Sequence, residues 1–300
     1  MFSIARAYSL ANTATDQIQL VHKMKSKRKL IGSKSISGSG RSTGRSLTRF
    51  RPTRKILRVP KASNAEAEAE AEAEVYYEGL YGKWKVDGRD KLEVYGYRAA
   101  ISVMAAAALF SALSNAVGLD RGVQDASYFA AASGLGVALA LVHIYVSEIK
   151  LAMQAMYVVG LIGSVGIAVT NTDVSVLSFV EEHRATVWLI GPMFAAFTGL
   201  AFKEGACYGK PEAFSLFLIT PLMCLGHLTG LASREVELFF CASFLLAVSI
   251  FALRKYTQAI KDDIGDKSVF TFRALKTDVE RKAYLESQGK DLSLLVEDGA

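Results

Sequence analysis

The sequence predicts an all-α protein, a polytopic membrane helix bundle with six transmembrane helices. Three observations support this prediction. The chain contains six apolar windows, each close to the roughly 20 residues that a helix needs to cross a bilayer. The turns between several of them are too short to hold a soluble domain. Lysine and arginine gather on alternate connections, as they do on the insertion side of membrane proteins.

The six windows make up a domain at residues 99–253. They carry almost no charge and are, in order, 99–119, 126–146, 151–170, 185–202, 213–233 and 236–253. A soluble core that buried six such segments would need far more polar surface than 300 residues supply, whereas helices satisfy their own backbone hydrogen bonds in lipid. The apolar piece at 174–180 is too short to span and is expected to lie in the interface.

The distribution of basic residues predicts the orientation. Thirteen lysines and arginines fall on one side of the windows and three on the other, namely Arg121, Arg184 and Arg234. The positive-inside rule therefore places both termini on the side from which the protein inserts. That side is the stroma in a plastid or the matrix in a mitochondrion.

Residues 1–63 have the composition of an organelle transit peptide. They contain 15 Lys and Arg, ten serines and a single acid, Asp16, and no apolar run long enough for a secretory signal. A basic arm that stays attached and binds nucleic acid or membrane is the alternative. Because mitochondrial and plastid presequences overlap in composition, this segment does not select the organelle.

The other flanks of the bundle are polar. Residues 64–98 begin with an Ala-Glu alternation, expected to be a disordered acidic spacer, and continue with aromatic and basic residues, expected to anchor the chain at headgroup level. A partner-docking surface is the alternative for the aromatic part. Residues 254–300 are predicted to form a soluble polar tail with one helix at 278–288.

Two histidines within apolar windows are candidate functional residues. His143 lies near the inserting end of the second window, and His227 lies nearer the opposite end of the fifth. Because the two imidazoles are at different depths, a bis-histidine haem site is not expected. A buried neutral histidine bonded to a backbone carbonyl is the alternative for each. The three cysteines show no metal-ligand spacing and no disulfide framework, so packing is their simplest role.

Small residues and prolines mark three of the windows. Gly160, Gly163 and Gly166 recur every third residue, which favours close helix packing over a ligand groove. Gly191-Pro192 and Thr220-Pro221 are expected to interrupt and kink the fourth and fifth helices. Broken helices can mark a transporter, but both prolines fall in the second half of the chain and there is no internal repeat.

The segment 202–212 is the densest polar cluster between the windows and is expected to be a loop. Its candidate binding or transport residues are Lys203, Glu204, Cys207, Tyr208, Lys210 and Glu212. The functional interpretation is a site for an anionic headgroup, a small anion or a partner protein. A solvated connector whose lysines only set the topology is the alternative.

This segment, with the motif TPL at 220–222 and the motif LGHL at 225–228, resembles an uncharacterised family of multi-pass integral membrane proteins of cyanobacteria and plant plastids. The resemblance covers residues 95–256. It implies a plastid location with stromal termini. It transfers no catalytic residue, because the family has no assigned activity.

The sequence thus favours a multi-pass protein of the thylakoid or inner envelope that acts as a small permease or channel for an ion or metabolite. A scaffold or assembly factor for photosynthetic membrane complexes is the alternative, and an enzymatic activity is disfavoured. No cofactor, metal site or nucleic-acid partner is expected. The expected partners are the lipid bilayer and either a membrane protein complex or further copies of the chain.

Overall fold

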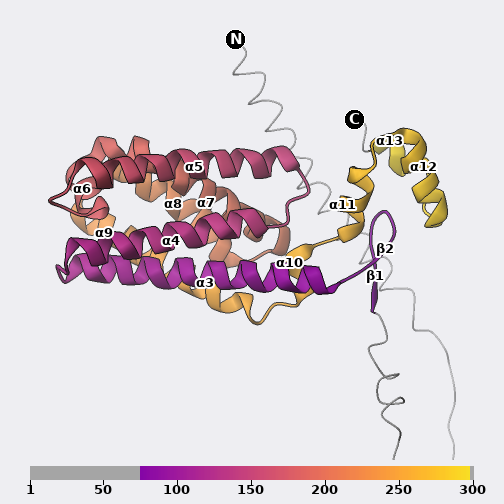
Figure 1. Cartoon of the computed structure of the whole chain (residues 1–300), viewed down its shortest axis with the longest axis horizontal. Coiled ribbons are helices and arrows are strands. Elements are labelled where there is room, and N and C mark those ends of the chain that lie inside the picture. The colour runs from indigo at the N-terminus through magenta and orange to yellow at the C-terminus, as the bar shows by residue number, and fades with distance from the viewer. Residues whose placement is uncertain (1–74, 298–300) are drawn as a thin grey trace, which may run out of the picture.

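The computed structural model describes residues 75–297, and within them six long helices lie alongside one another in a bundle (Figure 1). In chain order they are α3 (Gly88–Ala116), α4 (Arg121–Leu141), α5 (Ser147–Thr170), α7 (Val187–Tyr208), α8 (Pro211–Thr229) and α9 (Arg234–Lys255). The predicted transit peptide at 1–63 and the Ala-Glu repeat lie outside the described residues.

Successive long helices run in opposite directions, so the bundle has two ends with different connections (Figure 1). One end, the basic end, holds the start of α3, the turns at 142–146 and 209–210, and the end of α9. The opposite end holds the remaining turns, the short helix α6 (Val176–Glu182) and a 3-10 turn, η1 (Arg184–Thr186). The first and last described elements both lie at the basic end.

The helices close into a ring of neighbours around one apolar core. α3 packs most extensively on α4, α5 packs on α7, α7 on α8 and α8 on α9, and α9 returns to α3. The core between them consists mainly of Ala, Leu, Ile, Val, Met and Phe side chains. Many large apolar side chains on the outside of the bundle are exposed, as expected where lipid rather than protein covers them.

Five of the helices are long and apolar enough to cross a bilayer, namely α3, α5, α7 with the preceding 3-10 turn, α8 and α9. The helix α4 is not among them, so this criterion does not bear out the sixth predicted span. Its sequence explains the difference, because Arg121, Gln124 and Asp125 occupy its first turns and much of the rest is Ala, Gly and Ser.

The second apolar window also ends its helix earlier than predicted. A helix through Val146 is wrong, since α4 stops at Leu141 and the backbone becomes extended at Val142. Side chains from α5 cap the end of α4. The ammonium group of Lys150 donates to the carbonyls of Ala140 and Val142 at 2.8 and 2.9 Å, which satisfies groups that a longer helix would have used internally.

The predicted loop at 202–212 is mostly helical. The helix α7 continues through Tyr208, and only Gly209 and Lys210 separate it from α8. Gly209 adopts a left-handed φ of 63°, which suits glycine at the end of a helix, and Pro211 begins α8 with its fixed φ. The helices α7 and α8 each run through Pro192 and Pro221 without a break, so the predicted interruptions are wrong, whereas a kink at each proline stays a prediction.

The flanks fold against each other instead of extending into solvent. A hairpin of β1 (Tyr76–Glu78) and β2 (Lys83–Lys85) forms within the aromatic and basic segment and precedes α3. After α9 the chain forms α10 (Ile260–Ile264), α11 (Lys267–Ala274), α12 (Asp278–Ser287) and α13 (Leu294–Glu297). The predicted helix at 278–288 is confirmed as α12. A role of this region as a membrane anchor stays a prediction.

A small second core joins the hairpin to the tail. The ring of Tyr81 stacks on Phe272 with 3.9 Å between the centroids, and both side chains are buried. Val269, Leu285 and Leu294 complete this cluster. The carboxylate of Asp266 accepts a hydrogen bond of 2.6 Å from the backbone of Leu80, which ties the start of α11 to the hairpin turn. The tail is therefore part of the fold, contrary to the prediction of a peripheral solvated segment.

Candidate functional site

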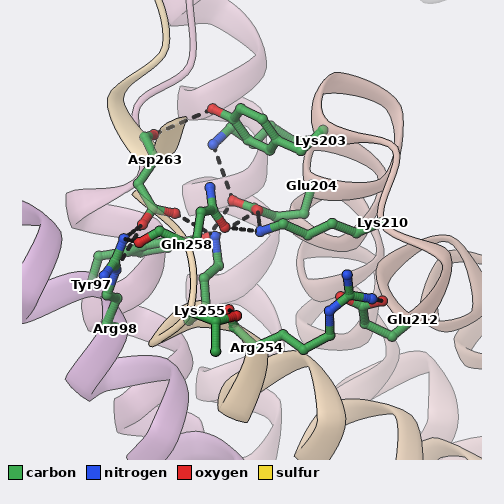
Figure 2. A network of polar contacts seen from close by, with 12 residues as sticks. Tyr97, Arg98, Lys203, Glu204, Lys210, Glu212, Arg254, Lys255, Gln258 and Asp263 are labelled. Carbon is green, nitrogen blue, oxygen red and sulfur yellow. Dashed lines mark hydrogen bonds and ion pairs between the residues drawn. The ribbon is translucent and has the colours of Figure 1, made fainter. Parts of the chain in front are cut away.

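Six charged side chains meet at the basic end of the bundle and form the ion network (Figure 2). They come from five places in the chain and are Arg98, Lys203, Glu204, Lys210, Lys255 and Asp263. Arg98 lies on α3, Lys203 and Glu204 on the last turns of α7, and Lys210 at the N-cap of α8. Lys255 ends α9, and Asp263 lies on α10.

Glu204 is the centre of this network and is completely buried. One carboxylate oxygen accepts hydrogen bonds from the Tyr97 hydroxyl at 2.9 Å and from Lys203 at 3.1 Å. The other accepts from Lys210 at 2.9 Å and from Lys255 at 2.6 Å. Four donors on three long helices and one turn therefore share this carboxylate, so Glu204 joins α3, α7, α8 and α9.

Asp263 extends the network from the bundle to the tail. Its carboxylate lies 2.6 Å from the ammonium group of Lys255 and accepts a 2.8 Å hydrogen bond from Nε of Arg98. The same guanidinium donates to the backbone carbonyl of Gln258 at 2.7 Å. Because Lys255 contacts both carboxylates, it connects Glu204 to Asp263 and holds α10 over the end of the bundle.

The charges of the ion network do not cancel. Four cations face two carboxylates, and all but Lys210 are less than a tenth exposed. Burying a charge costs several kcal/mol unless opposite charges and hydrogen bonds compensate it. The network thus leaves a surplus of positive charge at a place with little access to water.

A pocket of about 440 Å³ lies against this network and is called the ion pocket here. It has walls from the hairpin, the turn between α4 and α5, the end of α7, the end of α9 and α10. Five of the eight candidate residues line it: His143, Lys203, Cys207, Tyr208 and Lys210. Its size lies in the range typical of small-molecule sites, about 300–1,000 Å³.

The remaining two acidic candidates lie beside the pocket and do not line it. Glu204 accepts hydrogen bonds from Lys203 and Lys210, and these two lysines line the pocket. Glu212 is buried on the first turn of α8. Its Oε2 forms an ion pair with Nη1 of Arg254 at 2.6 Å, and Arg254 does line the pocket. The predicted polar cluster is therefore a real cluster in space, but helix ends rather than a loop hold it in place.

His143 follows the end of α4 in the wall of the ion pocket. Burial lowers the pKa of its imidazole, and the nearby positive charge of Lys203 lowers it further. Its Nε2 lies 3.3 Å from the carboxylate of Glu93. Because the lowered pKa favours the neutral imidazole at pH 7, His143 adds a polar group and no charge to the pocket. The neighbouring Tyr145 has a pKa raised to about 12 by burial, and its hydroxyl accepts from the backbone of Asp266.

His227 lies in a different place. Its Nδ1 is 2.8 Å from Glu237 on α9, and its Nε2 is 2.9 Å from the carbonyl of Val180 on α6. It lines a second pocket of about 400 Å³, the apolar pocket, whose walls are mostly Ala, Leu, Val, Met and Phe. The two histidines therefore share no cavity, and His227 fastens α8 to α6 and α9.

The cysteines follow the same division. Cys207 lines the ion pocket, whereas Cys224 and Cys241 line the apolar pocket, and none of the three forms a disulfide within the described residues. Among the residues from 75 to 297, no group of three or more His, Cys, Asp or Glu side chains is placed to hold a metal ion.

Sequence reasoning missed several members of the site. The sequence predicts Arg98 as part of the anchor and Lys255 as a flanking charge that sets the topology, although each adjoins a long apolar window, which is a usable signal. Asp263 and Gln258 gave no signal, because they lie in a tail whose composition is that of a solvated segment. Trp84 was assigned to a membrane anchor, but it lies in the wall of the ion pocket.

Comparison with known proteins supports the membrane assignment. Residues 137–272 match the family described as uncharacterized integral membrane protein (DUF2301). The matched range begins within α4 and ends within α11, so it contains all eight candidate residues. No curated protein and no solved structure matches the chain. Together with the five candidate spans, this similarity identifies the chain as a multi-pass integral membrane protein of unknown activity, similar over residues 137–272 to an uncharacterised membrane protein family.

Proposed function

We propose that this membrane protein is a small permease for an ion or metabolite, and that the solute binds in the ion pocket. The observation that carries this proposal is the placement of buried charged side chains from spanning helices directly beneath an open pocket. Ionisable residues within spans are costly and usually mark a solute or ion pathway. Lys203, Glu204 and Lys255 all lie within candidate spans.

The arrangement of the two pockets also suits a permease. Along α3, Ile101 lies between Tyr97, which donates to Glu204 of the ion network, and Met104, which lines the apolar pocket. Leu200 on α7 and Phe251 on α9 occupy the corresponding positions, and all three side chains are at most 1% exposed. A layer of packed side chains thus lies between the two pockets. A shift of helices at this layer would open one cavity while closing the other, which is the essence of alternating access.

Blocking the ion pocket should stop transport in reconstituted vesicles. Cys207 provides the handle, because a bulky methanethiosulfonate reagent attached to its thiol would fill the pocket. With Cys224 and Cys241 replaced by alanine, labelling should remove most of the flux of a transported small ion or metabolite. A matched protein that also carries Cys207→Ala should keep its flux in the presence of the reagent. Absence of flux across a broad solute panel, or full flux after complete labelling confirmed by mass spectrometry, would refute the permease.

The scaffold alternative has less support. A scaffold would offer partners the small-residue helix faces, the aromatic segment and the tail. The helix α7 packs closely against Gly160 and Gly163. The aromatic hairpin and the tail pack on each other. Each of these surfaces is therefore used within the chain, so the permease is the stronger proposal.

We also propose six membrane crossings with both termini in the stroma of a plastid, in the thylakoid or inner envelope membrane. Both ends of the described chain lie at the basic end, which supports an even number of crossings with α4 as the sixth. Three of the basic residues lie at the other end, where Arg121 donates to the carbonyl of Thr172 at 2.9 Å. Composition of residues 1–63 supports import into an organelle.

A reporter fusion tests the location. A fluorescent protein fused behind residues 1–65 should accumulate in plastids, because this segment is basic, serine-rich and nearly free of acids. The same fusion with its Lys and Arg replaced by Gln should remain outside the organelle. Mitochondrial fluorescence of the unaltered fusion would overturn the plastid assignment.

A further inference from the structure

Two buried N–H donors in the wall of the ion pocket have no acceptor among residues 75–297. One is Nε1 of Trp84, on a side chain that is 6% exposed, and the other is Nε2 of Gln258. Leaving a buried donor unpaired costs about 1–3 kcal/mol. Two such donors in one pocket indicate that an acceptor belongs there.

The orientation of each donor is fixed by its surroundings. Lys210 donates a hydrogen bond to Oε1 of Gln258, so the amide cannot be reversed without placing its NH₂ group against an ammonium. Trp84 pairs with Tyr77 across the hairpin, with their ring centroids 5.0 Å apart. Neither donor can therefore turn away to find another partner at low cost.

The charges around the pocket favour an acceptor that is negative. The ion network and the other charged lining residues together have six cations and five carboxylates, counting the Glu212 partner of Arg254. The cations are Arg98, Lys203, Lys210, Arg254, Lys255 and Lys261, and the carboxylates are Glu204, Glu212, Asp262, Asp263 and Asp266. Asp266 directs its oxygens toward the backbone of Leu80 and toward Ser268. An anion would supply the missing charge.

We propose that the ion pocket binds an anion that carries a phosphoryl group, either a small phosphate compound or a phospholipid headgroup. A phosphoryl group has three strong acceptor oxygens, whereas a carboxylate has two. The donor side chains that line the pocket include Trp84, Lys203, Lys210, Gln258 and Lys261. The cavity of about 440 Å³ also leaves room for the body of a small metabolite behind the phosphoryl group. This inference rests on the proposed permease in naming its solute class.

Tryptophan fluorescence of the full chain in detergent tests the site directly. The chain has two tryptophans, and Trp188 is 73% exposed on α7, so Trp188→Phe leaves Trp84 as the sole reporter in the pocket. Inorganic phosphate and glycerol 3-phosphate, added at constant ionic strength, should each change this fluorescence with saturation. Chloride and succinate serve as comparison anions, and vesicles of phosphatidylglycerol serve as the lipid arm.

Two variants assign the response to the pocket. Gln258→Glu keeps the side chain's size and its contact with Lys210 but replaces the free donor by a charged oxygen, so it should abolish phosphate binding. Lys261→Met should weaken binding about tenfold, the effect of losing one charge-assisted hydrogen bond. Lys282→Met, on the exposed face of α12, is the matched control and should bind as the parent does. Thermal unfolding of each variant shows whether it is folded.

The outcomes separate this inference from the permease. Saturation by soluble phosphates identifies a free solute, and saturation by phosphatidylglycerol alone identifies a headgroup. Equal binding of succinate and phosphate, or no saturable change in the folded parent, overturns the phosphoryl assignment. Phosphate binding without flux would leave the site standing and refute the permease. Flux of a solute without phosphate binding would support the permease and refute the phosphoryl site.

Discussion

Replacing Glu204 by glutamine should lower the free energy of unfolding by about 3–5 kcal/mol, the usual cost of removing one partner from a buried ion pair. Glu204 is completely buried and accepts from three ammonium groups and one phenol. The variant would leave four cations of the ion network facing the single carboxylate of Asp263. Glutamine would also present its NH₂ group to at least one lysine, which is repulsive.

The loss can be measured as a fall in the thermal unfolding midpoint in detergent, or as a faster loss of monodisperse protein at a fixed temperature. Glu235→Gln is the matched control. It makes the same chemical change on the exposed first turn of α9 at the opposite end of the bundle, and should alter stability little. A similar effect of both variants would show that the ion network contributes no more than a surface charge.

A second substitution distinguishes charge imbalance from lost packing. Adding Lys210→Met to Glu204→Gln removes one uncompensated cation from the network, so the double variant should be more stable than Glu204→Gln alone. Purely additive losses would indicate that the two side chains act independently, in contradiction to the 2.9 Å contact between them.

Much of the bundle could be predicted from the sequence because it follows from composition. Long uncharged windows form helices wherever lipid or a core surrounds them, and the windows that became α3, α5, α8 and α9 lie within a few residues of the predictions, apart from the early start of α3. The end of α4 was not predictable in this way, because it depends on Lys150 of the next helix capping its carbonyls. The end of α4 is therefore set by a side chain of α5, which a hydropathy pattern does not reveal.

The site was predictable in part, for a related reason. The polar residues from Lys203 to Glu212 stand out between apolar windows, and the structure does gather them. Lys255 lies 51 positions from its partner Glu204, and Arg98 lies 165 positions from its partner Asp263, so only the fold brings these residues together. Their types match those of ordinary flanking charges, and only three-dimensional packing makes them buried partners. The sequence places His227 nearer the opposite end from His143, and its hydrogen bonds to Glu237 and to the carbonyl of Val180 agree with that placement.

Gly163→Leu should separate α5 from α7 and destabilise the bundle by more than the ~1–3 kcal/mol typical of core overpacking. A Cβ atom at Gly163 would overlap the backbone carbonyl of Leu189, and one at Gly160 would overlap the backbone of Met193. Backbone cannot rotate aside as a side chain can, so the helices themselves must move apart. These two glycines confirm the predicted packing face, whereas Gly166 has open space where a Cβ would stand.

Gly166 supplies a control on the same helix with the same substitution. Gly166→Leu should leave the unfolding midpoint unchanged or raise it slightly, because leucine favours helix over glycine by about 1 kcal/mol or less and meets no atom within 4 Å. Size-exclusion profiles after graded heating would compare the two variants in one detergent. Equal losses at both positions would contradict the α5–α7 contact. A loss confined to Gly163 would show that glycine serves here to bring two backbones together, and that α7, which carries Lys203 and Glu204, is positioned through this contact.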